Sequence, residues 1–240
     1  MPRLVLPLVI AVLSLAAVPP AQAQAPPLAK PLPDPLGLRG INLGMTLAEV
    51  RKLGHPDKPA GKIELVCTGD EQERQVALVL DSFDKDYVAA GAKICGFHAL
   101  DRDRIRSLPV DVGGHDATVR FFFTPKSAVP ATSERLYTID VSTSPRNFDS
   151  LVDSYKTKFG EPNDTVELDG KTLSWYGKKS TIQIEEYRMG ELPGLLQSGR
   201  PIKDLTKGRT MMIQYSDEAL LGAFLDEKAK SAKKSGADKL

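Results

Sequence analysis

The chain has 240 residues, 41% of them hydrophobic, and carries 32 basic against 31 acidic side chains. This balance excludes bulk nucleic-acid binding, because such binding needs a surplus of Lys and Arg to displace the counterions of the phosphates. The length suffices for one large core or for two smaller ones.

Residues 1–23 have the features of an export signal. Arg3 supplies a positive charge, the 15-residue run 4–18 is largely apolar, and Ala21-Gln22-Ala23 is a small-residue cleavage site. The run is shorter than the roughly 18–20 residues that span a bilayer, although an uncleaved anchor is an alternative interpretation. No cysteine stands at the cleavage site, so we expect no lipid anchor. We predict a periplasmic or secreted protein without an integral membrane segment after cleavage.

The two cysteines, Cys67 and Cys95, are predicted to form one disulfide, because an even count in an exported chain is typical of a structural bridge. Closing this loop would stabilise the fold by roughly 3–4 kcal/mol. The alternative is two free or catalytic thiols, although redox pairs usually stand as C-x-x-C.

A proline-rich segment, 24–37, follows the signal, and its five prolines predict an extended linker. The fold is expected to begin near Leu38. The first predicted helix follows a capping box, in which Thr46 and Glu49 satisfy each other's backbone amides. Its expected apolar face consists of Leu47, Val50 and Leu53.

One short phrase ends this helix and recurs 106 residues later: KLGHPD at 52–57 and KFGEPN at 158–163. In each copy a glycine suits the turn that ends a helix and a proline prevents continuation. The second helix is predicted to start at Ser144-Pro145 or at Asn147. Its apolar positions follow the helical period, and they are Phe148, Leu151, Val152, Tyr155 and Phe159.

Four segments of alternating polarity are predicted as strands after each helix, each covered on one face. After the first helix they are 62–67, 93–99, 117–124 and 135–142, and after the second they are 165–168, 172–176, 180–187 and 210–216. Val166, Leu168 and Trp175 are expected to face inward, and Tyr176 outward, where it could join a recognition patch.

The predicted fold class is therefore α+β, with tandem helix-plus-four-stranded antiparallel sheet units at 38–143 and 144–216. Insertions separate several of the strands, and the longest in the second unit precedes its last strand; such loops often bind ligands. A C-terminal helix and a basic tail occupy 217–240. Ser216 is the expected cap, and the apolar stripe of this helix consists of Leu220, Leu221, Phe224 and Leu225.

The segment LGMTLAEVRKLGHP resembles the signature of the SmpA/OmlA (BamE-like) family, in which G-M-T precedes a helix and an apolar-G-x-P stop ends it. The matching residues are Gly44-Met45-Thr46 and Leu53-Gly54-His55-Pro56. The tandem layout is similar to that of β-lactamase inhibitory proteins. The resemblance implies the fold unit, and it assigns no binding residue to this chain.

The three histidines are the candidates for acid–base or metal chemistry. His55 lies in the helix-stop turn and is expected to be exposed. His98 stands three residues after Cys95, which is half of a zinc pattern without a second pair. His115 precedes Asp116 at a Gly-Gly turn, and no nucleophile motif accompanies it.

Asp81, Asp84 and Asp86 lack the glycine and glutamate of an EF-hand loop. We therefore assign no metal, no cofactor and no catalytic residue. The predicted function is non-enzymatic binding of an unknown protein or cell-envelope component. The alternatives are a hydrolase that uses His98 or His115 and an inhibitor of a secreted enzyme.

Overall fold

The computed structural model describes residues 30–58, 63–76, 78, 82–101, 104–126, 133–167, 170–188 and 209–237. The predicted signal 1–23, the start of the predicted linker, Leu168 and the insertion before the last strand lie outside these residues.

The described elements alternate between short helices and strands along the chain. The strands are β1 (Gly37–Leu38), β2 (Ile41–Asn42), β3 (Ile63–Cys67), β4 (Lys93–Asp101), β5 (Arg104–Ser107), β6 (Val110–Val112), β7 (His115–Phe123), β8 (Leu136–Thr143), β9 (Asp164–Glu167), β10 (Lys171–Tyr176), β11 (Ser180–Arg188) and β12 (Arg209–Asp217). The α-helices are α1 (Leu47–Leu53), α2 (Ser82–Ala89), α3 (Phe148–Phe159) and α4 (Glu218–Ala237), and the 3₁₀-helices are η1 (Glu71–Gln75) and η3 (Pro145–Asn147).

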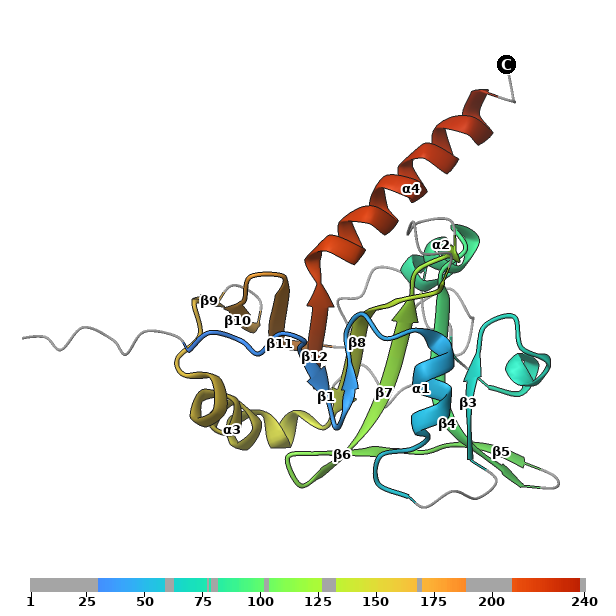
Figure 1. Ribbon diagram of the computed structural model, residues 1–240. Helices are drawn as coiled ribbons and strands as arrows, with labels where there is room; N and C mark the ends of the chain where they lie inside the picture. The colour runs from blue at the N-terminus through green and yellow to red at the C-terminus, as the bar shows by residue number, and fades with distance from the viewer. Residues whose placement is uncertain are drawn as a thin grey trace, which may run out of the picture.

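Ten of the strands form one antiparallel sheet with the order β3-β4-β7-β8-β12-β11-β10-β9, in which β5 pairs with β4 and β6 with β7 (Figure 1). All eight predicted strands are therefore present. β8 and β12 pair from Met211 opposite Thr143 to Ser216 opposite Thr138. β8 is the last strand of the first predicted unit, and β12 is the last strand of the second. They lie side by side, and their pairing makes the sheet continuous.

The first predicted unit differs from the prediction, because its insertions also contain regular structure. The segment between the second and third predicted strands forms β5 and β6, which pair with β4 and β7. The segment between the first two contains η1 and α2. Short segments within these insertions, such as Val110–Val112, pair with strands of the sheet, and local sequence does not reveal this pairing.

Helices cover both faces of the sheet. α1, α3 and the β1–β2 hairpin pack on one face, and they share a core with inward residues such as Phe121 and Trp175. α2 and α4 pack on the other face, where Phe224 of α4 stacks on Tyr137 at 5.2 Å between ring centroids. Only the first part of α4 contacts the sheet, and the helix extends past it (Figure 1, red).

The helices α1 and α3, which precede the two predicted sets of strands, begin and end as their sequences indicate. The Thr46 and Glu49 capping box is present, with the Thr46 amide 2.7 Å from the Glu49 carboxylate. Gly54 and Gly160 end α1 and α3 with φ of 71° and 82°, a region that favours glycine. The expectation for Leu53 was wrong, since this side chain is 55% exposed, whereas Leu47 and Val50 of the same predicted face are buried.

The polar residue that ends each copy of the repeated phrase ties the helix-stop turn to a strand. The Asp57 carboxylate accepts a hydrogen bond from the Asp111 amide of β6 at 2.7 Å and pairs with Arg39. The Asn163 side-chain oxygen accepts from the Tyr176 amide of β10 at 2.8 Å. The phrase therefore ends a helix and also attaches its turn to the sheet.

The compact fold begins before Leu38, in contrast to the prediction. Leu32 and Leu36, inside the predicted linker, are buried in the main core, and the Lys30 amide donates to the Phe159 carbonyl. The leucines between the prolines supply apolar contacts that a proline-based prediction of an extended linker does not consider.

Three further expectations were wrong in detail. Val166 is 42% exposed because β9 is an edge strand without a covering helix. The cap of α4 is Asp217, whose carboxylate accepts from the Ala219 and Leu220 amides, while Ser216 is buried in β12. Leu225 is exposed, and α4 continues through the predicted basic tail to Ala237.

The predicted disulfide between Cys67 and Cys95 is present and joins directly opposite residues of β3 and β4. Among the described residues, no helix is long and apolar enough to cross a membrane.

Candidate functional site

The structure places none of the three histidines in a catalytic arrangement. His55 is buried against Phe97, with ring centroids 5.0 Å apart, so the expectation of an exposed residue was wrong. His98 is also buried, and its Nδ1 lies 2.9 Å from the Gly96 carbonyl. Burial lowers the pKa of both His55 and His98, because a buried imidazole resists protonation. Both therefore act as packed core residues.

His115 has a hydroxyl within reach but not the geometry of a base. Its Nε2 lies 3.1 Å from the Ser150 hydroxyl, which donates its proton to the Asn147 carbonyl. The hydroxyl proton therefore points away from the imidazole. Among the described residues, Ser150 is the sole polar partner of His115, so no carboxylate orients the ring as a general base requires.

The predicted acidic cluster does not form a cation site. Asp84 is buried and pairs with Arg120, while Asp86 lies 4.0 Å from Lys228; Asp81 lies outside the described residues. No group of three or more metal-ligating side chains occurs in the part of the chain that the structure describes.

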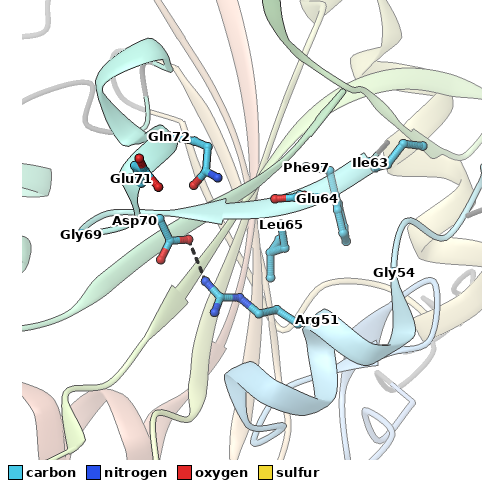
Figure 2. A pocket seen from close by; sticks show the side chains of 10 residues that line it. All are labelled: Arg51, Gly54, Ile63, Glu64, Leu65, Gly69, Asp70, Glu71, Gln72 and Phe97. Atoms are coloured by element: carbon cyan, nitrogen blue, oxygen red, sulfur yellow. Dashed lines mark hydrogen bonds and ion pairs between the residues drawn. The ribbon is translucent and has the colours of Figure 1, made fainter. Parts of the chain in front are cut away.

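A groove of about 610 Å³ lies at the end of the sheet that β3 forms (Figure 2). The end of α1 forms one wall, and the turn and η1 after β3 form the other. Its floor is the strand itself, with Leu65 beside Phe97 of β4. The side chains that define the groove are Arg51, Glu64, Leu65, Asp70, Glu71 and Phe97.

The outer side of β3 carries backbone groups that face the groove. In an antiparallel sheet, successive residues of a strand direct their N–H and C=O to opposite sides. The Cys67 amide donates to the Asp70 carboxylate at 2.9 Å, and the Cys67 carbonyl accepts from the Asp70 amide. Cys67 therefore faces outward, and Leu65, two residues earlier, faces outward as well. By this alternation the N–H and C=O of Leu65 face away from β4, and no hydrogen bond joins them to another described residue.

The neighbouring strand confirms this alternation. Phe97 lies directly opposite Leu65, and its carbonyl accepts from the Leu108 amide at 2.9 Å. Phe97 thus directs its carbonyl away from β3. Glu64 and Val66 must make the β3–β4 hydrogen bonds, while Leu65 leaves its own backbone groups free for the groove.

An ion pair closes one end of this open edge. The Arg51 guanidinium donates to the Asp70 carboxylate at 2.7 Å, across the outer side of β3, as Figure 2 shows. The same carboxylate holds the Cys67 amide. Charged side chains commonly protect exposed sheet edges from pairing. The Arg51–Asp70 ion pair protects the edge at Cys67 and does not reach Leu65.

The electrostatics of the groove are acidic. Arg51 compensates Asp70, whereas Glu64 and Glu71 are exposed and have no ion-pair partner among the described residues. Two uncompensated carboxylates therefore flank the strand, and the groove favours a cationic ligand group.

The floor of the groove is held rigidly by aromatic packing. Phe97 contacts His55 on one side and Phe121 on the other, in edge-to-face arrangements. The disulfide joins β3 to β4 two residues after Leu65. The groove therefore presents a fixed strand rather than a loop.

No local sequence pattern indicates this site. Its residues come from four separate segments, and only the sheet order shows that β3 has no described strand on its outer side. The exposed Tyr176, which was considered for a recognition patch, lies on β10 near the opposite end of the sheet. It does not belong to the groove.

No known protein family matches the chain, and neither a curated protein nor a solved structure does.

Proposed function

We propose that the protein is an exported, non-enzymatic binding module that captures a segment of another protein in the groove beside β3. The observation that carries the proposal is an open, rigid sheet edge enclosed between two walls. Apolar floor residues, free backbone hydrogen-bonding groups and two uncompensated carboxylates are the contacts that peptide recognition uses.

Export to the periplasm or beyond is part of this proposal. The signal-like residues 1–23 motivate it, and a disulfide is compatible with an oxidising compartment. The hydrolase alternative has less support, because neither His98 nor His115 lines the groove.

We also propose that the chain contains two related helix-plus-sheet units of the kind found in BamE-like proteins. The strand order supports this, since β7, β4 and β3 lie outward of β8 as β11, β10 and β9 lie outward of β12. The equivalent roles of Gly54 and Gly160, and of Asp57 and Asn163, support it further.

The test is affinity capture from periplasmic extract with the full mature chain and two variants. The double variant Glu64→Lys with Glu71→Lys reverses the groove charge without touching the core. Glu167→Lys is the matched control, because it reverses an exposed glutamate on β9, at the other end of the sheet.

We expect the wild type and Glu167→Lys to retain the same protein, and the double variant to retain at least tenfold less. Equal retention by the wild type and both variants would place binding elsewhere and reject the groove. Retention of a lipid or glycan but no protein would reject a protein partner.

A further inference from the structure

We propose that the partner binds by strand addition: an extended segment pairs antiparallel with β3 and alternates apolar and basic side chains. This inference rests on the proposed function and specifies its binding mode and the chemistry of its partner.

The backbone of β3 provides the pairing groups. Leu65 directs both its N–H and its C=O into the groove, and Ile63 does the same by the alternation of the strand. A residue placed opposite Leu65 can donate to its carbonyl and accept from its amide. Because Asp70 already bonds Cys67, the ladder cannot continue past that point. The added strand therefore pairs along the Ile63–Leu65 part of the edge.

The side chains along this edge determine the expected sequence pattern. Leu65 points to the sheet face that α1 covers and belongs to the main core. Glu64 points to the opposite face and is exposed. In a paired strand, residues directly opposite share a face. The partner residue opposite Leu65 is therefore apolar, and the residue opposite Glu64 is basic.

The walls reinforce both preferences. The stem of Arg51 lies on the α1 side of the groove, beside Leu65, while Glu71 lies on the η1 side (Figure 2). An apolar side chain packs against the Arg51 methylenes, and Glu71 adds negative charge close to the strand. The segment that fits is short, with basic residues on either side of an apolar one.

A second copy of this chain fits the edge poorly. In an antiparallel pair of two β3 strands centred on Leu65, Ile63 of each copy would face Cys67 of the other. Cys67 cannot pair there, because its amide already donates to the Asp70 carboxylate. Pairing would also bring Glu64 and Glu71 of both copies together, and like charges at a sheet interface oppose association.

The experiment uses the full mature chain and a capped synthetic peptide of alternating lysine and valine, five residues long. Its matched control carries N-methyl groups on the valines, which removes the amides that would donate to Leu65 but keeps every charge. A second control replaces each lysine with glutamate. Amide hydrogen exchange resolved by NMR is followed with and without each peptide.

At saturating lysine-valine peptide, we expect the Leu65 amide to exchange at least tenfold more slowly. The Val66 amide, which already bonds β4, should not change. The N-methylated peptide should bind at least tenfold more weakly. Glu64→Lys should weaken binding by a similar factor and favour the glutamate-valine peptide, while Glu167→Lys leaves binding unchanged.

Three results would overturn the inference. Equal binding of the N-methylated peptide would show docking through charge alone. An unprotected Leu65 amide in a saturated complex would place the peptide elsewhere. Protection of Leu65 in the protein alone, rising with concentration as sedimentation detects a dimer, would identify a second copy as the occupant. If capture from extract is lost in the Glu64→Lys and Glu71→Lys double variant but Leu65 stays unprotected, the proposed function stands and strand addition fails.

Discussion

Replacing Arg120 by methionine should destabilise the protein strongly, because Arg120 is the centre of a buried polar network that joins α2 to the strands β7, β8 and β12. Its guanidinium on β7 pairs with Asp84 of α2 and with Asp140 of β8. Gln214 of β12 donates to the second oxygen of Asp140 at 3.1 Å. Arg120, Asp140 and Gln214 occupy facing positions on three adjacent strands.

The expected cost follows from the burial of the two carboxylates. Their side chains are 5% and 7% exposed, and the Arg120 side chain beside them is 13% exposed. Removing one partner of a buried ion pair typically costs about 3–5 kcal/mol, since it leaves an uncompensated charge. Arg120→Met leaves two such charges, so we expect a loss of about 4 kcal/mol. At a slope of about 2 kcal/mol per M, the urea midpoint falls by about 2 M.

The pH dependence tests the same cause. Burial raises the pKa of Asp140, and Arg120 and Gln214 oppose this rise. Without Arg120 the folded-state pKa lies still higher above the unfolded value of about 3.9. The folded state with a protonated Asp140 is favoured at low pH. This stability is lost as the pH rises through the folded-state pKa of Asp140. The deficit of Arg120→Met should therefore be full at neutral pH and shrink toward pH 4.

The assay is urea unfolding of the mature chain with its disulfide intact, followed by circular dichroism. Arg146→Met is the matched control, since Arg146 is exposed, and it should change stability by less than about 0.5 kcal/mol. Adding Asp84→Asn and Asp140→Asn to Arg120→Met should recover at least half of the loss. A loss below about 1 kcal/mol, or no recovery on neutralising the acids, would refute the argument.

Three further predictions follow from single features of the fold. Replacing Cys67 and Cys95 by alanine should lower the free energy of unfolding by about 3–4 kcal/mol, because the bridge closes a loop with a sequence separation of 28; a loss below 1 kcal/mol in urea unfolding contradicts this. Tyr137→Phe should stabilise the fold by about 1 kcal/mol, since it removes a buried hydroxyl that has no hydrogen-bond partner among the described residues; destabilisation in the same assay would contradict this. Burial lowers the pKa of His55, so the unfolded chain takes the proton first and stability falls as the pH drops below about 6.5. His55→Gln should flatten that slope in pH-dependent unfolding; a slope equal to that of the wild type would contradict the assignment.

Local sequence was sufficient for the features that depend on neighbours in the chain. The capping box at Thr46 and Glu49, the glycine stops at Gly54 and Gly160 and the apolar face of α3 need only a few consecutive residues. The alternation that predicted eight strands is equally local. The disulfide was predictable because the chain contains only two cysteines.

Other features required contacts between distant segments. Alternating polarity predicts a strand but does not identify the strand that pairs with it. The pairing of β8 with β12, and the edge position of β3 among the described strands, therefore could not be predicted from the sequence. Val166 and Leu53 have the apolar character of core residues but lie exposed, because no element of the described part of the chain covers them. His55 was expected at the surface and is buried, because Phe97 packs against it from another strand.

The sequence by itself determined where the helices start and stop, which segments form strands and which cysteines pair, because short-range hydrogen bonding and periodicity decide these features. The tertiary structure alone decided the sheet order, and with it the groove. Arg51, Leu65 and Asp70 have no distinguishing local pattern, and they become a site only because β3 ends the sheet between α1 and η1. Whether a strand keeps free hydrogen-bonding groups depends on whether another strand lies beside it, and that is a property of the whole fold.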